Sequence, residues 1–284
     1  MYKKMLVAID GSESSLYALR QSLKLAREAE CLVTVVSVIP RYEGDLGSMW
    51  INNMRDSMRI PCERALSEAE ETAKEERIFI KTVCEEGEIY ERIVDLADAE
   101  NCDLIVMGTK GLSGFEKVLV GSVTARVIGH TQRDVLVVPK KVPVDWKNIL
   151  LATDGSKYSE TAANRVIKIV KFFGANLKIV SVVNVPPEIY SHITAPGVVS
   201  SLVKKATGYA EVAQKKAEAE GVGTEVFVQE GEAWQVITEL ARKEDIGLIV
   251  IGSHGRTGLR RLLMGSVAEK IIGNSPCPVL VVRA

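Results

Sequence analysis

The segment Gly252-Ser253-His254-Gly255, followed by Gly265-Ser266, decides the fold around it. The apolar residues 248–251 before it predict a buried strand, and residues 267–272 after it have helical spacing. Glycines at a strand-to-helix junction let the backbone approach a ligand without an intervening Cβ, and the N–H groups of a helix start attract anions. The segment therefore predicts a phosphate-binding loop.

The same pattern occurs earlier in the chain, as Gly108-Thr109-Lys110-Gly111 with Gly121-Ser122 after the apolar residues 104–107. The two loops are offset by 144 positions, from 108 to 252. A fixed offset over the whole length indicates tandem duplication of one domain. Other residue pairs keep this offset: Asp10/Asp154, Gly11/Gly155, Ser12/Ser156, Ser37/Ser181, Gly87/Gly231 and Leu136/Leu280.

Length and composition limit the class of protein. A chain of 284 residues predicts two domains, and the repeat places them at residues 1–140 and 145–284. The formal net charge of −1 lacks the strong positive field of a dedicated nucleic-acid binder. Neither a signal-peptide pattern nor an apolar run of about 18 residues occurs, so we expect no membrane partner and a cytoplasmic location.

Strand and helix patterns alternate along each half. In the first half they predict strands at 4–9, 32–39, 78–84, 103–107 and 135–138. They also predict a first helix that is capped by Ser12, followed by helices at about 50–76, 88–100 and 122–130. This alternation predicts an α/β fold with two tandem, doubly wound, Rossmann-like parallel sheets, each with five strands in the order 3-2-1-4-5. Ligands of such sheets bind where the winding direction reverses, here between strands one and four.

The residues at that reversal have structural as well as functional interpretations. Asp10 and Asp154 follow the first strand of each half, where a carboxylate can accept hydrogen bonds from ribose hydroxyls, but Asp-Gly is also a common turn pair. The glycine loops alone could form a turn and a helix cap. No GxxxxGK[ST] motif occurs, and no GxGxxG follows the first strand, which argues against a P-loop enzyme and a dinucleotide dehydrogenase.

Basic side chains near the two loops differ in number. The second loop is the more basic, so we expect it to bind a triphosphate more tightly, although scattered charges are also typical of a solvated surface. The basic residues are Lys110 and Lys117 in the first loop, which also carries Glu116, and His254, Arg256, Arg260 and Arg261 in the second.

Cysteine and histidine spacing gives no metal-site pattern. The five cysteines show no CxxC spacing and an odd total, so we expect reduced, small apolar side chains. They are Cys31, Cys62, Cys84, Cys102 and Cys277. The three histidines are too dispersed for a zinc site, so no metal ligand is predicted.

Both loops fit the pattern G-x2-G-x9-G-[ST] after the fourth strand. Because of this pattern, the sequence resembles the ATP-binding branch of the universal stress protein family. The resemblance covers nearly the whole chain as two tandem domains. It implies one adenine nucleotide per half, ATP, AMP or ADP, with or without Mg²⁺. The motif residues that would hold the phosphates are Gly108, Gly111, Gly121 and Ser122 in the first half and Gly252, Gly255, Gly265 and Ser266 in the second.

The resemblance also implies roles for residues outside the motif. The ribose would lie near Asp10 or Asp154, and the base near Val38 or Val182. Val123 and Val267, which follow the motif serines, would also lie near the phosphates. Apart from the resemblance, the positions of His254 and Arg256 beside the second loop predict that these basic side chains meet phosphate oxygens there. The family further implies that the two halves pair through their fifth strands, with a homodimer as another arrangement.

The expected function is an ATP-binding stress-response module that regulates rather than catalyses. A nucleotide-dependent transferase or slow ATPase of the same fold group is the alternative, and it would need a general base beside the γ-phosphate. Among the loop residues, His254 is the candidate for that role. A scaffold that has kept the loops without a ligand is a third possibility.

Overall fold

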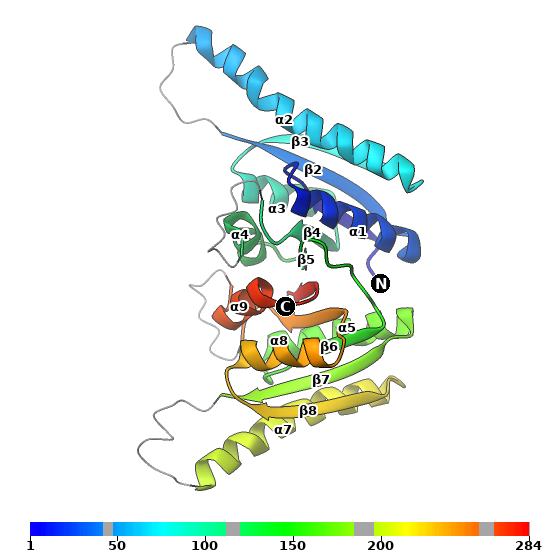
Figure 1. Cartoon of the computed structure of the whole chain (residues 1–284), viewed down its shortest axis with the longest axis vertical. Helices are drawn as coiled ribbons and strands as arrows, with labels where there is room; N and C mark the ends of the chain where they lie inside the picture. The colour runs from blue at the N-terminus through cyan, green and yellow to red at the C-terminus, as the bar shows by residue number, and fades with distance from the viewer. Residues whose placement is uncertain (42–47, 112–119, 185–195, 256–263, 284) are drawn as a thin grey trace. The chain divides into compact units, whose positions relative to one another are not determined.

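A computed structural model describes residues 1–41, 48–111, 120–184, 196–255 and 264–283. The chain divides into two compact parts, Tyr2–Lys141 and Val142–Ala284, called here the first half and the second half. Each half is an α/β sandwich whose helices cover a parallel sheet (Figure 1).

The first half contains five strands and four helices within the described residues, in strict alternation. The strand order is β3-β2-β1-β4-β5, and the described pairings are parallel. The elements are β1 (Lys4–Ala8), α1 (Glu13–Ala29), β2 (Leu32–Pro40), α2 (Ser48–Glu75), β3 (Ile80–Gly87), α3 (Ile89–Ala99), β4 (Leu104–Gly108), α4 (Ser122–His130) and β5 (Asp134–Val138).

The second half repeats this architecture. Its strand order is β10-β9-β6-β7-β8, which corresponds to the first-half order, and its described pairings are parallel. Its elements are β6 (Asn148–Ala152), α5 (Lys157–Phe173), β7 (Asn176–Val183), α7 (Pro196–Ala219), β8 (Thr224–Glu230), α8 (Ala233–Lys243), β9 (Leu248–Gly252), α9 (Ser266–Asn274) and β10 (Val279–Val282). The predicted doubly wound fold and the order 3-2-1-4-5 are therefore confirmed in each half.

The apolar strands are buried because helices cover both faces of each sheet. In the first half α1 contacts α2, and α3 contacts α4, so the winding places one pair on each face. The central strand β1 is buried from Met5 to Ala8, and β4 is buried along its whole length. This burial explains why the strands have continuous apolar sequences rather than alternating ones.

Two helices begin at the predicted cap. The Ser12 hydroxyl accepts a hydrogen bond from the Ser15 amide at 3.2 Å, and Ser156 does the same for Ser159 at 3.2 Å. The Asp-Gly-Ser segments thus end one strand and start the next helix, which fixes the direction of the aspartate side chain.

The largest differences from the predicted strand boundaries are at the third strand, which starts two residues later and ends three residues later than predicted. The other strands of the first half differ by at most one residue at each end. The sequence predicts the third strand at 78–84, but β3 begins at Ile80 because the preceding residues close α2. Arg77 has a φ of 56°, and the Ile78 amide donates to the Ala73 carbonyl at 2.9 Å. This is the hydrogen bond of a left-handed helix ending, and it keeps Ile78 out of the sheet.

The prediction that all five cysteines are reduced is wrong for two of them. Cys62 on α2 and Cys84 on β3 form a disulfide, with their Cα atoms 6.3 Å apart. The two positions meet because α2 packs on β3, a tertiary contact that cysteine spacing alone does not reveal.

The other three cysteines are buried thiols. Burial raises the pKa of Cys31 to about 12 and the pKa values of Cys102 and Cys277 to about 11. These thiols stay protonated at neutral pH, so they act as the small apolar side chains that the sequence predicted.

Within the described ranges, no helix is long and apolar enough to cross a membrane. The same residues contain no group of three or more His, Cys, Asp or Glu side chains that could hold a metal ion.

Candidate functional site

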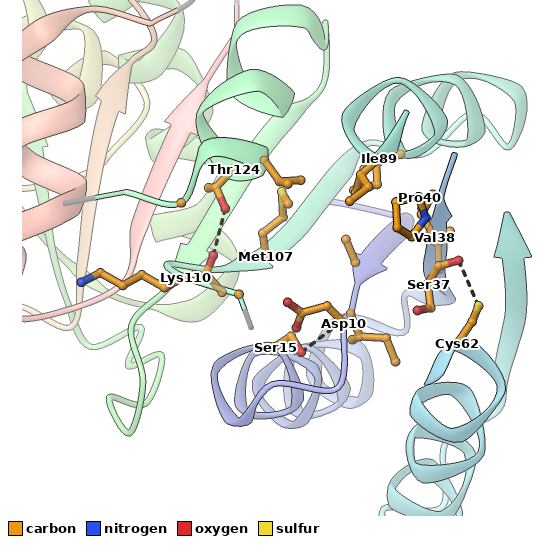
Figure 2. Close-up of a pocket in the computed structure, with 18 of the residues that line it drawn as sticks. Asp10, Ser15, Ser37, Val38, Pro40, Cys62, Ile89, Met107, Lys110 and Thr124 are labelled. Atoms are coloured by element: carbon orange, nitrogen blue, oxygen red, sulfur yellow. Dashed lines mark hydrogen bonds between the residues drawn. The ribbon is translucent and has the colours of Figure 1, made fainter. Parts of the chain in front are cut away.

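The first half has a cavity of about 430 Å³ at the carboxyl ends of β1, β2 and β4. Figure 2 shows Asp10 within it, between the end of β2 and the loop that follows β4. This is the sheet edge where the winding direction reverses, as the sequence predicted. The sequence-predicted residues in its wall are Asp10, Val38, Gly108, Gly111, Gly121, Ser122 and Val123.

The second half has a smaller cavity of about 190 Å³ in the same place, at the ends of β6, β7 and β9. The sequence-predicted residues that line it are Asp154, Val182, Gly252, His254, Gly255, Gly265, Ser266 and Val267. Glu116, Lys117, Arg256, Arg260 and Arg261 lie outside the described residues. Each other predicted site residue lines one of the two cavities.

The aspartates are held by the turns in which they lie. Oδ1 of Asp10 accepts a hydrogen bond from the Ser12 amide at 3.0 Å, and Oδ1 of Asp154 accepts one from the Ser156 amide at 3.0 Å. The intervening glycines have φ values of 77° and 74°, which favour glycine. The turn role and the ligand role of these aspartates are therefore compatible, because the turn orients the carboxylate toward the cavity.

The first glycine of each motif is required by packing. A Cβ at Gly108 would lie 3.0 Å from the Ser14 carbonyl, and a Cβ at Gly252 would lie 2.7 Å from the carbonyl carbon of Tyr158. These distances mean that the strand end touches the backbone of α1 or α5. The first glycine thus allows close strand-to-helix packing at the site.

The second glycine of each motif lies against the aspartate. A Cβ at Gly255 would lie 2.9 Å from Oδ2 of Asp154, and a Cβ at Gly111 would collide with Oδ2 of Asp10. Glycine at these positions therefore lets the loop and the carboxylate approach each other across the cavity.

At the third glycine of each motif, a Cβ would clash less with the protein than at the first two glycines. Gly265 has φ −65° and ψ 139°, an ordinary extended conformation, and a Cβ there would have its nearest contact at 3.4 Å. A Cβ at Gly121 would lie 3.2 Å from its nearest neighbour, the Thr109 carbonyl oxygen. Space for a ligand is thus the simplest reason for glycine at Gly265.

The helices that follow these glycines begin at the cavity wall. α4 starts at Ser122 and α9 at Ser266, and in neither does the N-cap glycine supply a side-chain hydrogen bond. The first amides of such a helix lack intrahelical acceptors, and the helix dipole adds a partial positive charge. The arrangement suits an anion at this end of each cavity.

The basic side chains beside the loops differ between the halves. In the first, Lys110 lines the cavity, and its side chain extends away from Asp10 (Figure 2). In the second, His254 takes its place, with Nδ1 3.1 Å from the Ser253 hydroxyl and its ring 5.2 Å from the Tyr158 ring. His254 is therefore held by its neighbours at the edge of the cavity.

Sequence reasoning missed the apolar wall of the first cavity. The wall is formed by the tip of β2, one turn of α2, the start of α3 and the end of β4. Pro61, inside a helical stretch, is an unusual signal that could have pointed to it. The residues concerned are Ile39, Pro40, Pro61, Cys62, Ile89, Ile93 and Met107.

Comparisons with known proteins match each half and the whole chain. The family model described as the universal stress protein family matches residues 1–139 and 145–283. A universal stress protein of Methanocaldococcus jannaschii is 41% identical over 142 residues, which are 49% of this chain and 82% of that protein. The universal stress protein YxiE of Bacillus subtilis is 32% identical over 147 residues, 49% of this chain and 99% of that protein.

A solved structure supports the fold of the whole chain. The crystal structure of a universal stress protein from Archaeoglobus fulgidus has a TM-score of 0.76 and 24% identity, and the match covers 99% of this chain and 96% of that one. At this identity the likeness concerns the fold alone.

Proposed function

Because the chain belongs to the universal stress protein family, we propose that it is an adenine-nucleotide-binding regulator of the stress response, with one site in each half. The observation that supports this most strongly is the repeated cavity at the winding reversal. In each copy an oriented aspartate faces a glycine loop and an uncapped helix start.

The proposed binding mode follows from the chemistry of each wall. The phosphates lie against the amides at the start of α4 or α9, where both the N–H groups and the helix dipole favour an anion. The ribose hydroxyls donate to Asp10 or Asp154, and the base contacts the apolar end of the cavity near Val38 or Val182. The bound nucleotide is ATP, ADP or AMP, with or without Mg²⁺.

Regulation rather than catalysis is part of the proposal, with a slow ATPase or transferase as the alternative. The observation that favours the alternative is that His254 lines the second cavity beside the predicted phosphate loop. Enzymes commonly turn over at about 1 to 1,000 per second. Phosphate release in that range, abolished by His254→Ala, would establish the alternative, whereas negligible release supports the regulator.

The two halves are further proposed to pair through their fifth strands, β5 and β10. Both strands are apolar, and an exposed apolar edge strand tends to associate with other chains. Successive amides of a strand point to opposite sides, so an edge strand leaves alternate amides without a partner strand.

Hydrogen exchange of the full chain tests this pairing at β5, with β3 at the far edge of the first sheet as the internal comparison. If a further strand covers β5, all of its interior amides exchange slowly, whereas β3 shows alternating fast and slow amides. Alternating protection in β5 as well would contradict the pairing.

Calorimetric titration of the full chain with ATP, ADP and AMP, with and without Mg²⁺, tests nucleotide binding. The proposal predicts saturable binding of at least one adenine nucleotide. If none binds at millimolar concentration, the chain is a scaffold that has kept the loops.

A further inference from the structure

A disulfide forms part of the wall of the first cavity. Cys62 on α2 lines that cavity and is bonded to Cys84 on β3. Ser37 on β2 also lines the cavity, and its partner in the sheet register is Cys84. The sulfur of Cys62 lies 3.5 Å from the Ser37 carbonyl oxygen (Figure 2). The bond therefore fixes one turn of α2 against β2 and β3, at the apolar part of the cavity.

The turn of α2 that carries Cys62 lacks one helical hydrogen bond. Pro61 precedes Cys62, lies inside the helix and lines the same cavity. Proline has no amide hydrogen, so the bond that another residue would donate to the preceding turn is missing. The disulfide thus attaches α2 to the sheet at a point where the helix itself is less firmly held.

The second half joins the same two elements without sulfur. Ala206 and Val228 are the equivalents of Cys62 and Cys84, and they pack in an apolar cluster with Val183. A reductant has no bond to break in this cluster. The second half is therefore an internal control for any effect of the disulfide on the first.

Reduction changes the contacts at the cavity wall. A disulfide sulfur carries no hydrogen, whereas a thiol is a weak donor, so Cys62 can donate to the Ser37 carbonyl only in the reduced form. Two thiols are not bonded to each other, and their sulfur atoms need van der Waals separation. The turn of α2 is then free to move relative to β3, and Pro61 and Cys62 of the wall move with it.

Both sulfur atoms lie where a small reductant can approach. Cys62 lines the cavity, and Cys84 is half-buried on β3, the strand at the far edge of the first sheet. Thiol–disulfide exchange requires access of a thiolate to one of the two sulfurs. The position of the bond meets this requirement.

We propose that Cys62 and Cys84 form a reversible redox site that controls nucleotide affinity in the first half. A dithiol reductant supplies two electrons and two protons: the bond between the cysteines breaks, both become thiols, and the reductant closes its own disulfide. The oxidised pair holds the wall in the binding arrangement, so reduction weakens binding. This inference rests on the proposed nucleotide binding and adds regulation to one of its two sites.

The first test titrates the full chain with ATP before and after reduction by dithiothreitol, reading one site at a time. Gly265→Val disables the second site so that the first is read, and Gly121→Val does the reverse. The Kd of the first site should rise at least about fivefold on reduction, the lower end of typical couplings between sites, and reoxidation should restore it. The Kd of the second site should not change.

The variant with both Cys62→Ala and Cys84→Val is the matched control, because it gives the first half the apolar pair of the second. Its first-site Kd should be the same with and without dithiothreitol. Thermal unfolding without ligand shows whether the variant is folded. If it is not, Cys84→Ser alone, which also removes the bond, takes its place.

The coupling is reciprocal, which provides a second measurement. If oxidation favours nucleotide binding, the nucleotide must favour the oxidised pair by the same factor. A fivefold change corresponds to about 20 mV for a two-electron couple. Saturating ATP should therefore make the reduction potential of the pair at least about 20 mV more negative, as measured by thiol counts of the Gly265→Val chain in dithiothreitol redox buffers.

An equal or tighter first site after reduction would overturn the proposal, and so would five titratable thiols before any reductant. A loss of affinity at both sites would also overturn it, because it would show a general loss of structure. Failure of ATP to bind in either redox state is a different result. It would refute the proposed nucleotide binding itself, and its redox control with it.

Discussion

At the scale of single residues, the glycines of one motif serve different purposes. Gly252 is in close contact with the backbone of α5, whereas Gly265 has an ordinary backbone conformation and space for a Cβ. Both glycines fit the same sequence pattern, so the pattern alone does not distinguish packing from ligand binding.

Substitution at these two glycines should separate the two roles. Gly265→Val should remove ligand binding in the second half while the unfolding transition without ligand stays near that of wild type, since φ −65° suits a β-branched residue. Gly252→Ala should destabilise the fold by about 1 to 3 kcal/mol, because the added methyl group overpacks the contact with Tyr158. Thermal unfolding with and without ATP measures both effects. A large loss of stability in Gly265→Val would assign that glycine to the fold instead.

The positions of the aspartates and of the glycine loops could be predicted from the sequence, because local backbone chemistry at strand ends produces a visible pattern. Asp10 and Gly111 are 101 positions apart by number yet meet at one sheet edge, since parallel strands share their carboxyl ends. The contact between Tyr209 and the turn at Gly155 could not be predicted. It depends on which face of α7 meets this turn, and this is a property of tertiary packing.

At the scale of elements, ion pairs join the amino-terminal side of the first sheet to α3. The Glu100 carboxylate accepts a hydrogen bond from Lys4 on β1 and another from Lys81 on β3 at 2.5 Å. The Lys4 and Lys81 ammonium groups lower the pKa of Glu100 to about 2. The contacts therefore link two strands to the end of one helix.

This network predicts a definite pH dependence. A lowered carboxyl pKa in the folded state means that the contribution to stability is present above the unfolded pKa of about 4.5 and is lost as pH falls toward 2. The difference in melting temperature between wild type and Glu100→Gln should therefore be positive at pH 7 and vanish near pH 2. Glu71→Gln, at an exposed position of α2, is the control. A difference that stays constant between pH 7 and pH 2 would refute the role of Glu100.

The disulfide between α2 and β3 gives a second prediction at this scale. The equivalent pair in the second half is Ala206 and Val228, so Cys62→Ala with Cys84→Val substitutes the apolar pair of one half into the other. A disulfide that closes a loop of 22 residues stabilises the folded state by about 3 kcal/mol, because it lowers the conformational entropy of the unfolded chain. The variant should therefore have a melting temperature several degrees below that of wild type.

Thiol titration in denaturant checks the disulfide directly. The structure predicts three reactive thiols before reduction and five after it. Five thiols without any reductant would contradict the bond. The paired cysteines also show the limit of sequence reasoning, since Cys62 and Cys84 meet only after α2 packs on the sheet.

Element types are easier to predict than element ends. The alternation of apolar strands and amphipathic helices is strong, and the helix Ser122–His130 has the bounds that the sequence predicts. The start of β3 does not, because the left-handed conformation at Arg77 uses the Ile78 amide to end α2. Arg77 is not a residue that signals such an ending, unlike the glycine at the end of α5.

At the scale of the whole molecule, the two halves have the same topology but differ in packing and in charge. Each half has the same strand order, the same aspartate turn and the same uncapped helix start. The equivalents of Lys81 and Glu100 are Glu225 and Glu244, both bound to Lys178, so the charge at one position is reversed between halves. Duplication has therefore preserved the frame of the site while the surrounding packing and charges differ.

The most direct test of the central claim is the shift in melting temperature that ATP produces in wild type and in the variant with both Gly121→Val and Gly265→Val. A ligand that binds only the folded chain at 100 times its Kd stabilises it by about 2.7 kcal/mol. The account predicts an upward shift in wild type and none in the double variant, with similar melting of both without ATP. An equal shift in both proteins would contradict it, because ATP would then bind somewhere other than the two glycine loops.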